Sequence, residues 1–134
     1  SKGDIRAMGF LSGLLGLASD VDVGALAHEL DPVLLPNEAI EIAFQLMRDQ
    51  IVFTDRRVIL IDKQGMTGRK RQYHSIPYRA VTMFSAETAG SFDTDAELRI
   101  WVSGQPHPFT QNLARGANLA GIQKALAGGV LGRV

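Results

Sequence analysis

The chain has 134 residues, a length that suits one domain with its own hydrophobic core. Its 46% hydrophobic residues exclude a largely disordered chain, and the absence of cysteine excludes disulfides, thiol nucleophiles and cysteine-based metal sites. The 14 basic and 14 acidic side chains balance, which disfavours nucleic-acid binding over the whole surface.

Residues 1–36 are predicted to form a helical leader before the main domain at 37–134. Within the leader, the spacing of apolar residues at 5–18 is that of a helix. Such a helix has an apolar face and, opposite it, a stripe of small residues that are mostly glycine. Because glycine weakens a helix, the stripe indicates close contact with another backbone, either in the chain's own core or in a second molecule. Asp4 and the shortness of the apolar run disfavour a signal peptide or a membrane span, so a cytoplasmic protein is predicted. The candidate interface residues of this helix are Phe10, Leu11 and Leu14.

A short helix and then a series of strands are predicted after residue 20. Asp20 and Asp22 are suitable caps for a helix that must end before Pro32. Beyond it, apolar and polar residues alternate with a period of two, and the first strand is expected to bury one face. A turn is predicted at 62–65 and an edge or corner at Pro77. Six or seven short strands, which indicate a β-sandwich or small barrel, are predicted at 40–47, 51–54, 58–61, 68–75, 80–87, 97–103 and 107–110.

The last predicted element is an amphipathic helix. Its pattern starts at Asn112, and the pair Gly128-Gly129 is predicted to stop it. A single helix after antiparallel strands most economically closes the open end of a barrel. The apolar stripe of this helix is also a candidate interface with a second molecule, formed by Leu119, Ile122 and Leu126.

No motif for a known reaction occurs in the chain. It has no phosphate-binding loop, no GxGxxG after a strand, no GxSxG and no HExxH. The histidines His28, His74 and His107 are far apart in sequence and lack metal-ligand spacing, so structural or surface roles are favoured. No catalytic residue, cofactor or metal site is therefore predicted, and the chain is not expected to be an enzyme.

Basic residues are concentrated in the middle of the chain. Residues 1–50 hold three basic and eight acidic side chains, whereas residues 51–80 hold seven basic and two acidic ones. Four of the basic residues flank a predicted hairpin tip, where they are candidates for binding a phosphate, an acidic membrane surface or a partner. The favoured alternative is that they cover a protruding hairpin or pair with the acidic segment of a neighbouring subunit. These four residues are Lys63, Arg69, Lys70 and Arg71.

Residues 48–104 resemble the bacterial pleckstrin-homology-like (PH-like) domain family, formerly classed as a domain of unknown function. The resemblance is carried by Phe53-Thr54 with Arg57 and by the segments at 62–65, 75–78, 87–90 and 92–93. It implies a mainly β fold with helices, a PH-like barrel of about seven antiparallel strands closed by a C-terminal helix. It also implies assembly into homo-oligomeric rings and no enzymatic activity. Phosphoinositide binding belongs to eukaryotic PH domains and does not transfer on fold alone.

Two functions are therefore weighed. The first is a non-enzymatic binding or scaffold module that self-assembles into a homo-oligomer through helices and strand edges. The alternative is an adaptor that binds an anionic ligand or an acidic membrane surface through the basic hairpin. Another protein remains a possible partner in either case, and nucleic acid is disfavoured because few aromatic residues accompany the basic ones.

Overall fold

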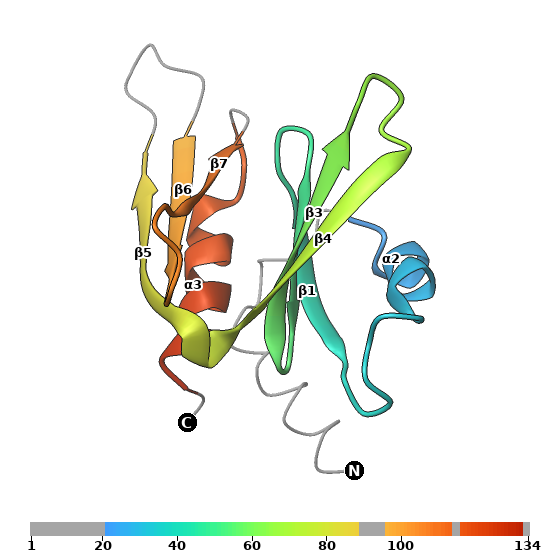
Figure 1. The fold of residues 1–134 in the computed structure, drawn as a ribbon, viewed down its shortest axis with the longest axis horizontal. Helices are drawn as coiled ribbons and strands as arrows, with labels where there is room; N and C mark the ends of the chain where they lie inside the picture. The colour runs from blue at the N-terminus through green and yellow to red at the C-terminus, as the bar shows by residue number, and fades with distance from the viewer. Residues whose placement is uncertain (1–20, 89–95, 114–115, 133–134) are drawn as a thin grey trace.

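The computed structural model describes residues 21–88, 96–113 and 116–132 (Figure 1). The predicted interaction helix at 5–18, with Phe10, Leu11 and Leu14, lies outside the described residues. None of the described helices has the length and hydropathy needed to cross a membrane. The elements in chain order are α2 (Val23–Leu30), β1 (Ile40–Gln45), β2 (Gln50–Thr54), β3 (Arg57–Gln64), β4 (Lys70–Pro77), the 3-10 helix η1 (Tyr78–Ala80), β5 (Val81–Glu87), β6 (Ala96–Val102), β7 (Phe109–Leu113) and α3 (Leu119–Val130).

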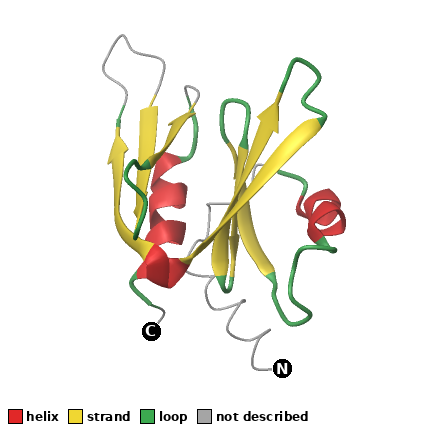
Figure 2. Ribbon diagram, in the orientation of Figure 1, coloured by secondary structure: helices red, strands yellow, loops and turns green. Residues whose placement is uncertain are grey.

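The seven described strands form two antiparallel sheets, and Figure 2 shows α3 beside the second of them. One sheet has the order β1-β2-β3-β4 and the other has the order β5-β6-β7. The predicted mainly β fold with a C-terminal helix is confirmed, but the strands do not pair into one closed barrel. Pro77 ends β4 and η1 then turns the chain, so β5 starts a second sheet instead of pairing beside β4.

The main core lies between the two sheets and α3. Phe44 and Phe53 pack edge to face with ring centroids 6.1 Å apart. Ile122 and Leu126 of α3 have no exposed surface in this core, and Leu119 packs against its rim. The structure therefore corrects the assignment of Ile122 and Leu126 to an intermolecular surface, because these two buried side chains attach α3 to its own domain. The interface role of the partly buried Leu119 stays a prediction.

A second, smaller core lies on the other face of the first sheet, beneath α2. Leu26 and Leu30 of α2 pack there against residues of β1, β2 and β3. Asp22 caps α2 as predicted, since its carboxylate accepts a hydrogen bond of 3.1 Å from the N–H of Ala25. The first strand was expected to bury only one face; both faces are buried because α2 covers the second.

Helix α3 differs from its prediction at both ends. It begins after Asn118, because β7 extends to Leu113, and the Asn118 side chain accepts a hydrogen bond of 2.9 Å from the N–H of Gly121. It continues through Gly128 and Gly129 to Val130. Gly129 is needed for packing and not as a stop, because a Cβ at this position would overlap the ring of Tyr78.

Two local predictions on strands β3 and β5 are also corrected. Strand β3 extends to Gln64, so the turn begins at Gly65 (φ +75°) and not at Asp62. A register shift between Val81 and Met83 places the former in the core and leaves the latter 52% exposed, although strict alternation puts both on one face.

Candidate functional site

The predicted basic cluster lies on the hairpin formed by β3 and β4. Lys63 pairs with Arg71 across the ladder, Gln64 pairs with Lys70, and Arg69 lies in the connecting turn. Residues directly opposite in an antiparallel pair share one face of the sheet. The cluster is therefore divided between the two faces of the sheet. Lys63 and Arg71 lie on the face that α2 covers. Lys70 lies on the opposite face, because it is the neighbour of Arg71 and successive side chains of a strand point to opposite faces.

Arg71 is already bound to an acidic residue of the same chain. Its Nη1 donates hydrogen bonds of 2.7 and 2.6 Å to the two carboxylate oxygens of Glu29 on α2, and the Tyr73 hydroxyl donates a third of 2.7 Å. Burial acts to raise the pKa of Glu29, but the hydrogen bonds from Tyr73 and Arg71 outweigh it and lower that pKa. The acidic and basic segments thus meet within one chain at this point, whereas one of the alternatives considered from the sequence was pairing between neighbouring subunits.

Lys63 lies beside this ion pair in a groove between α2 and the sheet. The groove has a volume of about 330 Å³, and Glu29, Lys63 and Arg71 are among its lining residues. The backbone N–H of Lys63 donates a hydrogen bond of 3.0 Å to the carboxylate of Asp49. The groove therefore already holds the Glu29 carboxylate, which is bound to Arg71.

The hairpin tip carries the remaining two cations of the cluster. Arg69 and Lys70 are exposed, and the described part of the chain contains no ion pair to either of them. The turn between β3 and β4 includes two glycines with positive φ, Gly65 (+75°) and Gly68 (+66°). Between these glycines, Met66 is the most exposed large hydrophobic residue in the part of the chain that the structure describes. Within the four-residue cluster, Arg69 and Lys70 are thus the cations that lie outside the groove and are exposed to an anionic partner.

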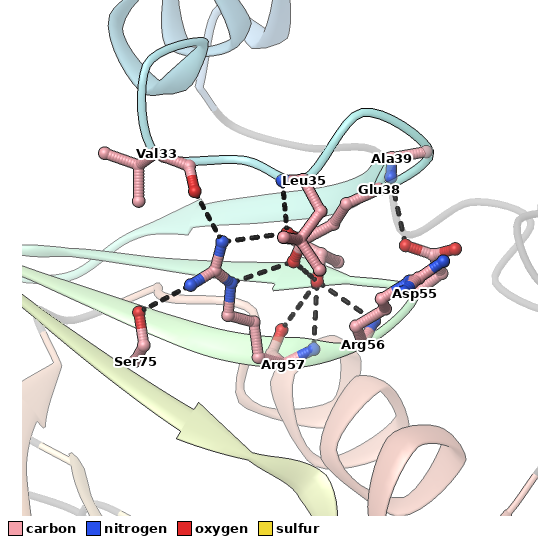
Figure 3. Close-up of polar contacts among 9 residues, drawn as sticks. Val33, Leu35, Glu38, Ala39, Asp55, Arg56, Arg57 and Ser75 are labelled. Atoms are coloured by element: carbon pink, nitrogen blue, oxygen red, sulfur yellow. Dashed lines mark hydrogen bonds and ion pairs between the residues drawn. The ribbon is translucent and has the colours of Figure 1, made fainter.

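A buried polar network that was not predicted connects the α2–β1 segment to the first sheet (Figure 3). The Arg57 guanidinium donates hydrogen bonds of 2.9 and 2.8 Å to the two carboxylate oxygens of Glu38, whose side chain has no exposed surface. The Thr54 hydroxyl donates another of 2.7 Å to Glu38, and Arg57 also donates to the carbonyl of Val33 and the hydroxyl of Ser75.

The electrostatics of this network favour an ionised Glu38. Burial acts to raise its pKa, but the hydrogen bonds from Arg57, from Thr54 and from the backbone N–H of Leu35 outweigh burial and lower the pKa. Both carboxylate oxygens of Glu38 are engaged inside the protein. The network therefore has a structural role. Thr54 and Arg57 were noticed as residues of the family resemblance, but no signal in the sequence connected them to Glu38.

The histidines do not come together. His28 lies in the last turn of α2, His74 packs its ring against Phe109 at 5.2 Å, and His107 is exposed in the connection between β6 and β7. Across residues 21–88, 96–113 and 116–132, no group of three metal-binding side chains is found.

Sequence comparisons relate the chain to bacterial proteins. The family described as "Bacterial PH domain" matches residues 9–130. The uncharacterized protein YjqA of Bacillus subtilis (strain 168) is 50% identical over 121 residues, which cover 90% of this chain and 97% of YjqA. The uncharacterized protein YozO of the same organism is 31% identical over 100 residues, which cover 75% of this chain and 85% of YozO.

Comparison of structures gives the same result. The crystal structure of a pleckstrin homology domain from Shewanella amazonensis SB2B superimposes with a TM-score of 0.80 at 54% identity, covering 92% of this chain and 99% of the other. A DUF1696 family protein with a pleckstrin-homology domain from Shewanella loihica PV-4 gives a TM-score of 0.73 at 49% identity. The match covers 84% of this chain and 96% of the other. The resemblance found in the sequence is thereby confirmed, and the chain belongs to the bacterial PH domain family.

Proposed function

We propose that this chain is a non-enzymatic binding module of the bacterial cytoplasm that self-assembles into a homo-oligomer, with a ring as the form of assembly. The observation that carries this proposal is the free edge of the two sheets. Strands β4 and β5, which η1 connects along the chain, are each an outermost strand of their sheet, as are β1 and β7 on the other sides (Figure 1).

This edge has the properties of a surface that another subunit covers. In the described part of the chain no strand pairs with the outer side of β4 or β5. A row of unpaired backbone N–H and C=O groups is a template for pairing with another chain. Two large apolar side chains lie partly exposed on these strands, Tyr73 at 38% and Met83 at 52%. A head-to-tail contact joins this edge to a different surface of the next copy. Such contacts generate a ring when the rotations between successive copies add up to a full turn.

Light scattering after gel filtration, at two protein and two salt concentrations, tests self-assembly. We expect a discrete multiple of 14.5 kDa that persists on dilution. Met83→Lys places a charge on β5. It should lower the mass of the assembly measured at a given protein concentration, because a charge buried without a partner disfavours the contact between subunits. Gln123→Lys, on the exposed side of α3, adds the same charge away from the edge and should leave the mass unchanged. A chain that stays monomeric at high concentration would exclude this function.

The hairpin tip supports a second function, the binding of an anionic partner. Arg69 and Lys70 are exposed cations beside a turn, and no ion pair within the described residues neutralises them. Cations of this kind form charge-assisted hydrogen bonds with phosphate oxygens. Because Arg71 is bound to Glu29, the site differs from the four-residue cluster predicted from the sequence and is centred on the turn.

Binding of inorganic polyphosphate, measured by calorimetry, tests this second function. We expect salt-sensitive binding that falls at least about tenfold in Arg69→Glu/Lys70→Glu, because reversed charges repel the polyanion. The matched control is Arg56→Glu/Lys124→Glu, which reverses two exposed cations elsewhere on the chain and should bind as the wild type does. Equal loss in both double variants would show that net charge and not the hairpin determines binding.

A further inference from the structure

The tip of the β3–β4 hairpin presents an apolar side chain at its outermost point. Met66 is completely exposed, and it lies between Gly65 and Gly68, which adopt positive φ. The turn that carries these residues extends away from the body of the domain (Figure 1). Full exposure of a large apolar side chain gives no stability to the folded monomer. Methionine is also flexible and polarizable, which suits contact with an irregular apolar environment.

A second turn at the same end of the first sheet also carries an exposed methionine. The β1–β2 turn and the β3–β4 turn lie at the same end of the sheet, because alternate connections of an antiparallel meander fall at one end (Figure 1). It carries Met47, which is 57% exposed, followed by the exposed Arg48. Each turn therefore combines an exposed methionine with a nearby cation.

Cations follow the exposed methionine closely in the sequence of both turns. Arg69 and Lys70 follow the β3–β4 turn directly, and Arg48 follows Met47 in the β1–β2 turn. None of these three residues has an ion pair among the described residues. Cations near an anionic bilayer are attracted to it, while adjacent apolar side chains are buried at the boundary between headgroups and acyl chains.

We propose that these two turns form a membrane-inserting tip, in which Met66, assisted by Met47, enters an anionic bilayer while Arg69, Lys70 and Arg48 contact lipid phosphates. This inference rests on the second proposed function and names its partner. A bilayer fits better than a protein because two short protruding turns fall short of the roughly 20–30 residues on each side of a stable protein interface. Exposed apolar side chains next to cations match the order of acyl chains and phosphates at a bilayer surface.

The absence of native cysteine makes a direct test of insertion possible. Met66→Cys provides a single attachment site for the environment-sensitive fluorophore NBD. Vesicles of phosphatidylcholine with phosphatidylglycerol should shift its emission to shorter wavelength and raise its intensity, and pure phosphatidylcholine vesicles should not. The matched control is Met83→Cys, an exposed methionine on β5 whose label should remain in water. Met47→Cys should show a smaller change in the same direction.

Affinity for the same vesicles provides a second readout with unlabelled protein. Met66→Ser should weaken binding about tenfold, the effect of withdrawing one buried apolar side chain, and Met83→Ser should not. Both side chains are exposed, so both variants should keep the wild-type melting temperature.

The outcomes separate insertion from anion binding. If phosphatidylglycerol vesicles bind through Arg69 and Lys70 but the label at residue 66 does not change, insertion is wrong and surface adsorption remains. If polyphosphate binds and vesicles do not, the hairpin recognises a soluble anion, and insertion is again wrong. If neither probe binds, the second proposed function fails together with this inference. An equal spectral change at residues 66 and 83 would also overturn it, because it would indicate general unfolding on lipid.

Discussion

Gly129→Ala is expected to lower the free energy of unfolding by about 2 kcal/mol, although alanine is the better helix former by about 1 kcal/mol. A Cβ at residue 129 would overlap three ring carbons of Tyr78. The ring has little freedom to move, because it is buried and its hydroxyl donates a hydrogen bond of 2.6 Å to the carbonyl of Thr54. Urea denaturation followed by circular dichroism measures the change.

Two further variants isolate the cause of that loss. Gly24→Ala in α2 is the control, because a Cβ there meets nothing closer than 3.4 Å and the helix propensity of alanine should make the variant slightly more stable. In a Tyr78→Leu background, Gly129→Ala should cost clearly less than in the wild type, since the overlapping ring is absent. An undiminished cost in that background would mean that the Tyr78 ring is not the reason for glycine at residue 129.

Arg57→Met is expected to destabilise the fold by about 3 kcal/mol, because it leaves the carboxylate of Glu38 buried without its cationic partner. The Glu38 side chain has no exposed surface, and Arg57 supplies two of its hydrogen bonds. Arg56→Met is the matched control, since the Arg56 side chain is exposed and should contribute little. The double variant Glu38→Gln/Arg57→Met should recover part of the loss, because the buried charge is then absent. Urea denaturation of all four proteins gives the comparison.

The loss of unfolding free energy caused by Arg57→Met should become smaller as the pH falls. In the wild type the pKa of Glu38 lies below its ordinary value of 4.5, so the network contributes fully above that value and its contribution is lost as the pH falls through the lowered pKa. Without Arg57, burial of Glu38 acts against fewer hydrogen bonds, and its pKa should rise. The difference in stability between wild type and variant should therefore narrow from pH 7 to pH 4. A difference that stays constant over this range would show that lost packing, and not the buried charge, is the cause.

The amino-acid sequence by itself determined the features that depend on near neighbours in the chain. A period of two indicated the strands, Asp22 marked the start of α2, and Pro77 marked the corner between the sheets. The residues of the family resemblance were equally local, and the comparisons confirmed the family. The basic hairpin was also visible in the sequence, because its cations lie close together along the chain.

The tertiary structure alone decided which faces are covered and which charges are free. The ion pair between Arg71 and Glu29 joins residues 42 positions apart, so counting charges along the chain could not separate Arg71 from the free cations at the tip. Arg57 is likewise separated by 19 positions from its partner, Glu38. Gly129 resembles a helix stop in the sequence, and only the folded structure shows that it makes room for the ring of Tyr78. The reason is physical: periodicity and turn chemistry act between adjacent residues, whereas burial, ion pairing and close packing depend on segments that only folding brings together.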